Sequence, residues 1–474
     1  MICLINPPNP PNAVSNKDMM AGFGQLYPGN SSTKVPPIDL AYIAALFKRE
    51  KIGFDIFECL GLNWGVSQLL ENVKRVKPNL IGIRTSTPTF EWDLKVADLI
   101  KNQLDSKIIL FGPHVGIYAD EVIAYSCVDG IILGEPEFTF LEIAKKGFKN
   151  TDGVWFKEDA KVIKNRSRGF IEDLDSLPFP AWELLPFREY NIGKYIRDIK
   201  PFVTVQASRG CPFSCDYCPY PVSQGKKWRT RSITNIIDEL EYLEKALGIK
   251  STLFRDPEFS LERERVVGIC NAIIDRGLEI KWRCETRIDT LDEELVNLFA
   301  KAGCIGINIG IESVNAEVLK RASRKAFPLK QASRIINACR ENRIDVFAFF
   351  ILGLPGETVK SSLRTIKYAK KLDPHFVQFT VVTPYKGTEL YKWAEAKGYI
   401  KDLDLRKVTG FEVIMGNENI TKEKLRDIVD FAYKYFKHTT IKEAIMNNFR
   451  PFNFLRDLRK VMELRRQQRA ILSD

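Results

Sequence analysis

The sequence predicts an α/β protein with two consecutive strand–helix domains and a helical C-terminal region over residues 396–474. Short apolar runs alternate with amphipathic helical patterns over residues 1–150 and again over residues 200–395, as expected for parallel sheets covered by helices. At 474 residues, the chain is too long for one ordinary domain. Its 45% hydrophobic and 28% charged residues are typical of a globular protein with an ample core.

Residues 1–150 are expected to form a doubly wound parallel sheet. The expected strands are Ile2–Ile5, Phe54–Phe57, Leu80–Ile83, Lys107–Phe111 and Gly130–Leu133. The stretches 38–49, 92–103 and 138–146 have the spacing of amphipathic helices. A dinucleotide is not favoured as the ligand, because there is no GxGxxG motif.

The ligand of such a sheet binds beyond the carboxyl ends of the strands. The residues that follow each strand are therefore the candidate contacts of this domain. They are Asn6, Pro8, Thr85, Ser86, Thr87, Gly112, Pro113, His114, Gly134, Glu135 and Glu137. The glycines let the backbone approach a ligand closely, and the hydroxyl groups offer hydrogen bonds.

Residues 151–199 are expected to be a linker that contains a small hairpin over Val154–Ile163. Several prolines prevent a continuous helix in the rest of the segment. Its aromatic side chains can pin the linker across a domain interface. These aromatic residues are Phe179, Trp182 and Phe187.

Residues 200–395 are expected to form six strand–helix units, which suggests a partial (β/α)6 barrel of the TIM type. The expected strands are Phe202–Ala207, Thr252–Arg255, Ile280–Cys284, Ile305–Ile309, Val346–Leu352 and Phe376–Val382. By analogy with full barrels, the chemistry is expected at the carboxyl ends of these strands.

Three cysteines, Cys211, Cys215 and Cys218, follow the first of these strands. Three thiolates on one short loop can hold three corners of a [4Fe–4S] cube and leave one iron open. A structural zinc site needs four ligands, and none of the three histidines of the chain is near. Three clustered cysteines cannot pair evenly as disulfides. An accidental cluster of cysteines is the remaining alternative.

The stretch Cys211–Cys218, with Tyr217 before the third cysteine, resembles the CxxxCxxC motif of the radical SAM superfamily. The resemblance implies that the open iron binds the amino and carboxylate groups of S-adenosylmethionine. It further implies that an electron from the cluster cleaves this sulfonium to methionine and a 5′-deoxyadenosyl radical.

Loops after the later barrel strands also resemble this superfamily, chiefly a GIES segment at Gly310–Ser313 and a GLPGET segment at Gly353–Thr358. The S-adenosylmethionine contacts that this resemblance implies are Tyr217, Asp256, Glu285, Arg287, Gly310, Glu312, Ser313 and Gly353. A cation such as Arg287 suits the carboxylate of the sulfonium ligand. Taken singly, Arg287 or Glu312 could instead form a salt bridge at the barrel rim.

The N-terminal domain resembles the Rossmann-like cobalamin-binding domain of the cobalamin-dependent (class B) radical SAM enzymes. The resemblance lies in the proline-rich first loop, GPH at residues 112–114 and GEPE at residues 134–137. A DxHxxG motif is absent, so the resemblance implies cobalamin bound without a histidine of this domain on cobalt. His114 could instead hydrogen-bond its own turn, and the domain could be purely structural.

The class B resemblance, over residues 1–395, implies methylation of an unactivated carbon by way of methylcobalamin. The cofactors expected are a [4Fe–4S] cluster, S-adenosylmethionine and cobalamin. Ring formation, rearrangement or C–C coupling are alternatives within the class. An RNA-modifying radical enzyme is a further alternative, but its three extra cluster cysteines are not matched by the widely spaced Cys3, Cys59 and Cys127. We expect a small-molecule or lipid-like substrate, an electron donor such as flavodoxin or ferredoxin, and no specific nucleic acid.

The net charge of +11 is concentrated in basic residues between Lys434 and Arg469. An apolar stripe with a basic opposite face could give peripheral membrane contact, whereas a terminal helix packed on the barrel is the simpler interpretation.

No apolar run is long enough to span a membrane, and no signal peptide is expected. The ten cysteines suit a reducing cytoplasm. In the basic loop after the cysteines, Arg229 and Arg231 are expected to pair with the following helix. The alternative is that this loop binds an anionic substrate head or orders the cobalamin tail.

Overall fold

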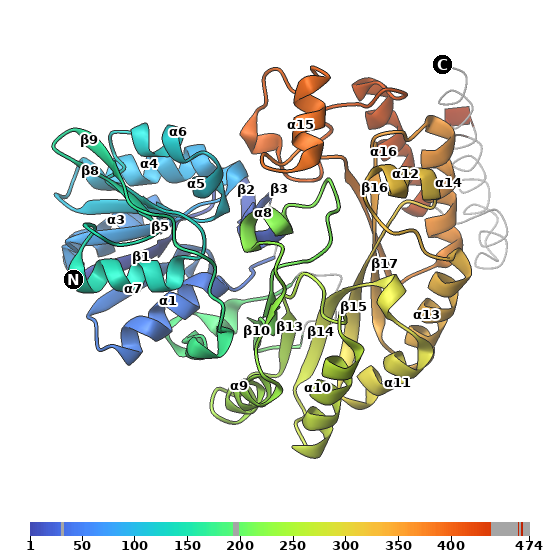
Figure 1. Ribbon diagram of the computed structural model, residues 1–474, viewed down its shortest axis with the longest axis horizontal. Coiled ribbons are helices and arrows are strands. Elements are labelled where there is room, and N and C mark those ends of the chain that lie inside the picture. Colours follow the sequence, from blue (N-terminus) through green and yellow to red (C-terminus); the bar gives the residue numbers. More distant parts are fainter. Residues whose placement is uncertain (30–32, 193–198, 438–462, 464–465, 468–474) are drawn as a thin grey trace, which may run out of the picture.

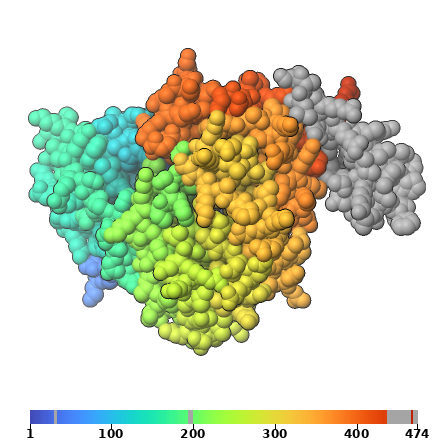
Figure 2. Space-filling view, turned by 45° about the vertical axis from the view of Figure 1, so that its right-hand side comes forward, coloured from blue at the N-terminus to red at the C-terminus, as the bar shows by residue number. Residues whose placement is uncertain are grey.

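The computed structural model describes residues 1–29, 33–192, 199–437, 463 and 466–467. Two large sheets form the frame of the molecule, one in each of the expected strand–helix domains (Figure 1). The C-terminal part of the described chain lies over one end of the second domain, as Figure 2 shows in orange and red. The predicted α/β class is confirmed.

The N-terminal sheet has seven strands in the order β4-β1-β5-β6-β7-β8-β9. The strands are β1 (Ile2–Asn6), β4 (Phe54–Glu58), β5 (Leu80–Arg84), β6 (Lys107–Phe111), β7 (Gly130–Ile132), β8 (Val154–Glu158) and β9 (Lys161–Lys164). The first five are parallel, as predicted, while the expected hairpin forms β8 and β9, which pair antiparallel beside β7. The sheet therefore runs past the expected boundary at residue 150, because the edge of β7 is free to pair with the hairpin.

Both faces of this sheet are covered by helices (Figure 1). Successive residues of a strand point to opposite faces, so Leu4 packs in the core cluster of one face and Ile5 in that of the other. One face carries α1 (Ile38–Arg49) and α7 (Pro136–Lys146), and the other carries α3 (Val66–Val76), α4 (Phe90–Lys101), α5 (Pro113–Ile117) and α6 (Ala119–Ala124).

A short hairpin of β2 (Ala13–Asn16) and β3 (Gln25–Pro28) was not expected from the sequence. Between its strands, the buried Lys17 ammonium donates to Asp93 Oδ1 at 2.8 Å and to the Arg84 carbonyl at 2.9 Å. The 3-10 turn Met20–Gly22 follows. The loop of this hairpin thus covers the carboxyl end of β5, where an open α/β sheet usually binds its ligand.

The second domain is a six-stranded parallel sheet in the order β10-β13-β14-β15-β16-β17. The strands are β10 (Phe202–Val205), β13 (Ser251–Phe254), β14 (Lys281–Arg287), β15 (Cys304–Glu312), β16 (Asp345–Leu352) and β17 (Phe376–Val381). The helices are α9 (Ile233–Lys245), α10 (Arg263–Asp275), α11 (Glu293–Lys301), α12 (Ala316–Arg321), α13 (Leu329–Glu341) and α14 (Val359–Leu372). They lie along the outside of the curved sheet (Figure 1), which confirms the predicted partial barrel.

One continuous apolar core joins the two domains. It includes Tyr42 of α1, Trp182 of the connecting segment and Trp282 of the barrel, all buried. The Ala181 amide donates to the Ala41 carbonyl, and Phe179 packs on Tyr242 of α9. The connector therefore fixes the domains to each other through aromatic packing, as predicted.

Beyond the barrel the described chain continues as α15 (Glu389–Ala396) and α16 (Lys422–Lys437). Among the residues that the structure describes, no helix is long and apolar enough to cross a membrane. The predicted basic terminal helix with its membrane contact falls mostly on residues 438–474, which lie outside the described residues apart from positions 463, 466 and 467.

Candidate active site and cofactor cavities

The cysteine loop is held at the carboxyl end of β10 by a small ribbon. Its strands are β11 (Ser208–Arg209) and β12 (Arg229–Thr230), and the short helix α8 (Tyr220–Gln224) lies between them. Gly210 turns the chain into the loop with φ +82°, and a Cβ at this position would lie 2.1 Å from the Lys227 carbonyl oxygen. Only glycine can make this turn at so close an approach.

All three cysteines line one cavity of about 240 Å³ inside the mouth of the barrel. Burial raises the pKa of the Cys211 thiol to about 11 and also raises the pKa of Cys218, so these thiolates need a cation beside them. In the part of the chain that the structure describes, no three His, Cys, Asp or Glu side chains converge on a single metal ion. A cubane is different, because each thiolate binds a different iron. The cysteines fit a cluster in this cavity.

Five of the eight residues expected to contact S-adenosylmethionine line the same cavity. They are Tyr217, Glu285, Arg287, Gly310 and Glu312. Glu312 has a left-handed backbone (φ +62°) at an irregularity in the pairing of β15 with β16. A non-glycine residue in this conformation is strained, and such strain is often found where a side chain must be aimed at a ligand.

The other three expected contacts lie outside the cavity and have structural partners. The Asp256 carboxylate accepts a hydrogen bond from the Ala207 amide at 2.8 Å, and burial raises its pKa to about 6. Ser313 Oγ accepts from the Asn315 amide. The Gly353 amide donates to Glu357 Oε2 at 2.6 Å. These three residues stabilise the loops behind the cavity wall.

Glu258 and Arg324 line the cavity but were not singled out from the sequence. Glu258 lies two residues after Asp256, and its carboxylate accepts from the Arg287 amide at 3.2 Å. Burial raises the pKa of Glu258. Strand alternation would place residues two apart on the same side, so it offers no signal that Glu258, rather than Asp256, faces the cavity. Arg324 follows α12 in a loop that carries no such signal either.

Two of the three arginines that line the cavity, Arg287 and Arg324, have different partners. Arg287 is paired with Asp289 through two contacts of 2.9 and 3.0 Å, and its guanidinium lies 4.2 Å from the centre of the Phe213 ring. Arg324 donates from Nη2 to the Gly310 carbonyl at 2.7 Å and lies 3.8 Å from Glu312. Its buried Nε has no hydrogen-bond partner among the described residues. Arg324 is thus a buried cation whose Nε can still donate a hydrogen bond to a ligand.

A second cavity of about 120 Å³ lies between the two domains. Five of the expected cobalamin contacts line it, namely Gly112, Pro113, Gly134, Glu135 and Glu137. The buried oxygens Asp18 Oδ2 and Glu137 Oε2, on residues that line this cavity, have no hydrogen-bond partner among the described residues. The amide side chains of a corrin ring can donate to such oxygens, since a buried carboxylate needs hydrogen bonds. The residues therefore fit cobalamin.

The other expected cobalamin contacts lie outside this cavity, in the packing of the strand ends. Asn6, Thr85, Ser86 and Thr87 are buried, and the Pro8 carbonyl accepts from the Trp92 indole. His114 is buried too, stacked on Tyr118, with Nδ1 3.3 Å from Thr87 Oγ1. Burial lowers the pKa of His114 to about 3, so its ring is neutral. Its hydrogen-bond partner belongs to the neighbouring loop rather than to its own turn.

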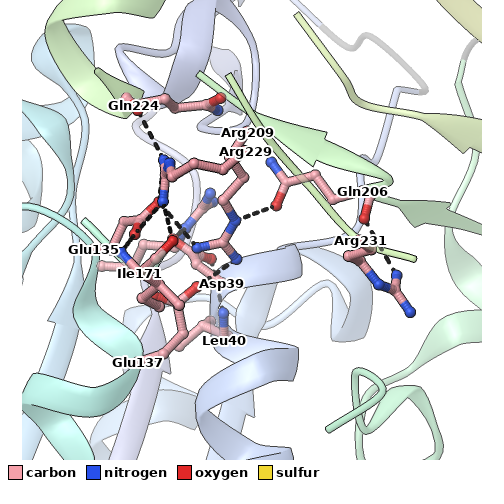
Figure 3. Close-up of polar contacts among 11 residues, drawn as sticks. Asp39, Leu40, Glu135, Glu137, Ile171, Gln206, Arg209, Gln224, Arg229 and Arg231 are labelled. Atoms are coloured by element: carbon pink, nitrogen blue, oxygen red, sulfur yellow. Dashed lines mark hydrogen bonds and ion pairs between the residues drawn. The ribbon is translucent and has the colours of Figure 1, made fainter. Parts of the chain in front are cut away.

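Glu135 and Glu137 also reach across the domain interface to two arginines of the cysteine ribbon (Figure 3). Arg209 lies 2.7 Å from Glu137 and 3.3 Å from Glu135, while Arg229 lies 2.9 Å from Glu135. None of the four side chains is more than 8% exposed. We call these four residues the interdomain clamp. It ties the loop after β7 to a point two residues before Cys211.

The clamp corrects one expectation about the basic loop. Arg231 does pair with the following helix, through Glu239 of α9. Arg229 instead pairs with Glu135 of the other domain and also donates to the Ile171 and Gln224 carbonyls at 2.7 and 2.8 Å. Glu135 and Ile171 lie far from Arg229 in sequence, so helical spacing alone could not indicate them.

Comparisons with known proteins agree with both cavities. Residues 205–369 match the radical SAM superfamily and residues 25–144 match the B12 binding domain. An uncharacterized methyltransferase of Pyrococcus horikoshii is 32% identical over 85% of this chain and 88% of its own length. An anaerobic magnesium-protoporphyrin IX monomethyl ester cyclase of Rubrivivax gelatinosus is 27% identical over 85% of this chain and 73% of its own.

Among solved structures, the radical S-adenosylmethionine methyltransferase TsrM of Kitasatospora setae, with cobalamin and a [4Fe–4S] cluster bound, has a similar fold. Its TM-score is 0.68 at 18% identity, over 85% of this chain and 79% of that chain.

Proposed function

The chain belongs to the cobalamin-dependent radical SAM enzymes, and on that premise we propose that it methylates an unactivated carbon of a small-molecule substrate. Its cofactors are a [4Fe–4S] cluster, S-adenosylmethionine and cobalamin. When bound, they supply radical chemistry and a transferable methyl group. The observation that carries the proposal is that the cavity of the three cysteines adjoins the cavity between the domains, with Tyr220 and Arg255 lining both.

Cys211, Cys215 and Cys218 would hold the cluster, and the proposed contacts of S-adenosylmethionine are the charged residues around them. We propose Arg324, rather than Arg287, as the partner of its carboxylate, because Arg287 is already paired with Asp289. Glu258 is suited to its ammonium group, since it is a buried carboxylate that lines the cavity. In a site shielded from water these charged hydrogen bonds are strong and directional.

Replacing Arg324 by glutamine is expected to weaken S-adenosylmethionine binding about 10- to 100-fold, as the loss of a charged hydrogen bond implies. Arg287→Gln is the matched control, expected to change the affinity less than about threefold because Asp289 already neutralises Arg287. Equilibrium dialysis with the cluster-loaded protein, without reductant, measures both. A larger loss for Arg287→Gln would contradict the assignment.

The substrate region of the cavity is expected to accept an uncharged, apolar group. Phe349, Ile351 and Val381 line it along β16 and β17, and Gln378 and Thr380 are its neutral polar groups there. Each arginine that lines the cavity has a carboxylate within 4 Å, so a phosphate or phosphonate would find little free positive charge. A lipid-like substrate is compatible with this lining.

The proposed electron donor is a flavodoxin or ferredoxin, and the proposed compartment is the cytoplasm. All ten cysteines are free, which suits a reducing environment. Peripheral membrane contact through the C-terminal segment stays a prediction.

The test of methyl transfer is the ratio of two products of S-adenosylmethionine. The anaerobically reconstituted enzyme is reduced and supplied with S-adenosylmethionine carrying a trideuterated methyl group, together with pools of apolar metabolites. Methylation is expected to give S-adenosylhomocysteine and 5′-deoxyadenosine in equal amounts and a product heavier by the labelled methyl group. Ring formation, as the similarity to the cyclase allows, would give 5′-deoxyadenosine without S-adenosylhomocysteine and would overturn the proposal.

A further inference from the structure

Two side chains separate the cavities of the two cofactors. Tyr220 and Arg255 line both, and no other described residue does. Tyr220 opens α8, two residues after Cys218, and Arg255 directly follows β13. Both residues therefore belong to the barrel, and their positions depend on the cysteine loop and on a strand end.

Glu285 holds the two side chains together. Its Oε1 accepts from Arg255 Nη1 at 2.6 Å, and its Oε2 accepts from the Tyr220 hydroxyl at 3.3 Å. Asn308 also donates to Oε1 at 3.4 Å. Arg255 and Glu285 are 6% and 19% exposed, so water competes little for these bonds. We call Tyr220, Arg255 and Glu285 the shared wall.

The shared wall is anchored on the cobalamin side as well. Arg255 Nη2 donates to the Asp18 carbonyl at 2.8 Å. Asp18 itself lines the cavity between the domains, and its carboxylate pairs with Arg84 at 3.0 Å. A ligand that fills either cavity thus touches side chains whose hydrogen bonds reach the other cavity.

We propose that Tyr220 and Arg255 are positioning residues that couple the binding of cobalamin to the binding of S-adenosylmethionine. Each ligand holds the shared wall in its Glu285-bonded arrangement, and the second ligand then binds to a wall already ordered. Such coupling is reciprocal and positive, because both ligands favour the same arrangement. The inference rests on the two cofactor sites of the family and not on methyl transfer.

The experiment measures binding alone. The dissociation constant of hydroxocobalamin is determined by absorbance titration of the cluster-loaded protein, anaerobically and without reductant, with and without saturating S-adenosylmethionine. In the wild type, S-adenosylmethionine is expected to lower this constant about fivefold or more. The ratio of interest is the dissociation constant of hydroxocobalamin without S-adenosylmethionine divided by the constant with it. In Tyr220→Phe and in Arg255→Lys this ratio is expected to fall to within about twofold of one, because each variant weakens a bond to Glu285.

The controls are residues that line one cavity only. Ser223→Ala alters the cavity between the domains and Gln378→Ala alters the barrel cavity, so each can shift one affinity while the ratio stays at the wild-type value. Thermal unfolding checks that all variants fold. A wild-type ratio of one, or a wild-type ratio retained in both wall variants, overturns the inference. Failure of the wild type to bind hydroxocobalamin would instead overturn the cobalamin site itself.

Discussion

Cys215→Ala is expected to lose the cluster and, with it, all cleavage of S-adenosylmethionine. A cube held by three thiolates has no protein substitute for the third ligand at this loop, since the nearby side chains of the cavity are apolar, cationic or already hydrogen-bonded. Iron after anaerobic reconstitution and desalting should fall from about four per chain to a small fraction of that value. Formation of 5′-deoxyadenosine under reducing conditions should fall to the level of the buffer.

The fold is expected to survive this change. Cys215 is only partly buried, in a loop at the barrel mouth, and truncation of such a side chain usually alters the free energy of unfolding by about 0.5 kcal/mol or less. Cys339→Ala is the matched control, because Cys339 is buried in α13 outside the cavity. Wild-type iron content in Cys215→Ala, or loss of iron in Cys339→Ala, would contradict the assignment of the cysteine loop.

The strands and the cysteine loop could be predicted because their signals are local. Apolar runs mark the strands of both sheets, and the expected strand Lys107–Phe111 and helix Ile38–Arg49 have the observed bounds. The hairpin of β2 and β3 could not be predicted in this way. Its four-residue strands are too short for a clear alternation, and its buried Lys17 has an ion-pair partner, Asp93, far along the chain.

The orientation of individual site residues depends on single-residue offsets at the strand ends. Asp256 and Glu258 both follow β13, but only Glu258 faces the cavity. The irregular pairing near Gly310 and Glu312 likewise decides which residues of the GIES segment point inward, and Ser313 does not. Periodicity identifies the loop, whereas the side that each residue presents depends on the local backbone.

Glu135 and Glu137 show a second limit of sequence patterns. Their position after β7 predicts a contact with cobalamin, and they do line the cavity between the domains. Their arginine partners lie on a ribbon of the other domain, which no spacing within the GEPE segment can indicate. A carboxylate beside a cofactor site can thus be part of the frame of that site as well.

Arg209→Met is expected to lower the free energy of unfolding by about 3–5 kcal/mol, the usual effect of breaking a buried ion pair. Arg209 and Glu137 are 7% and 2% exposed, with 2.7 Å between them, so the variant leaves an uncompensated carboxylate in the interface (Figure 3). Arg166→Met, which breaks an exposed pair with Asp152, is the control and should leave the free energy of unfolding nearly unchanged. Denaturant unfolding of the apoprotein measures both.

The pH dependence of this loss separates an electrostatic clamp from simple packing. Burial raises the pKa of Glu137 even with Arg209 present, and loss of the arginine should raise it further. A carboxyl group whose pKa is higher in the folded state than in the unfolded state destabilises the fold when it is ionised. This effect is complete at a pH above both pKa values and absent at a pH below both, where the group is protonated in each state. The free energy of unfolding that Arg209→Met loses relative to wild type should therefore become smaller as the pH falls from about 8 to about 5. Adding Glu137→Gln to Arg209→Met should restore part of the lost free energy at high pH. A deficit that is independent of pH and unaffected by Glu137→Gln would mean that Arg209 stabilises the interface only through its contacts with Tyr42 and Gln206.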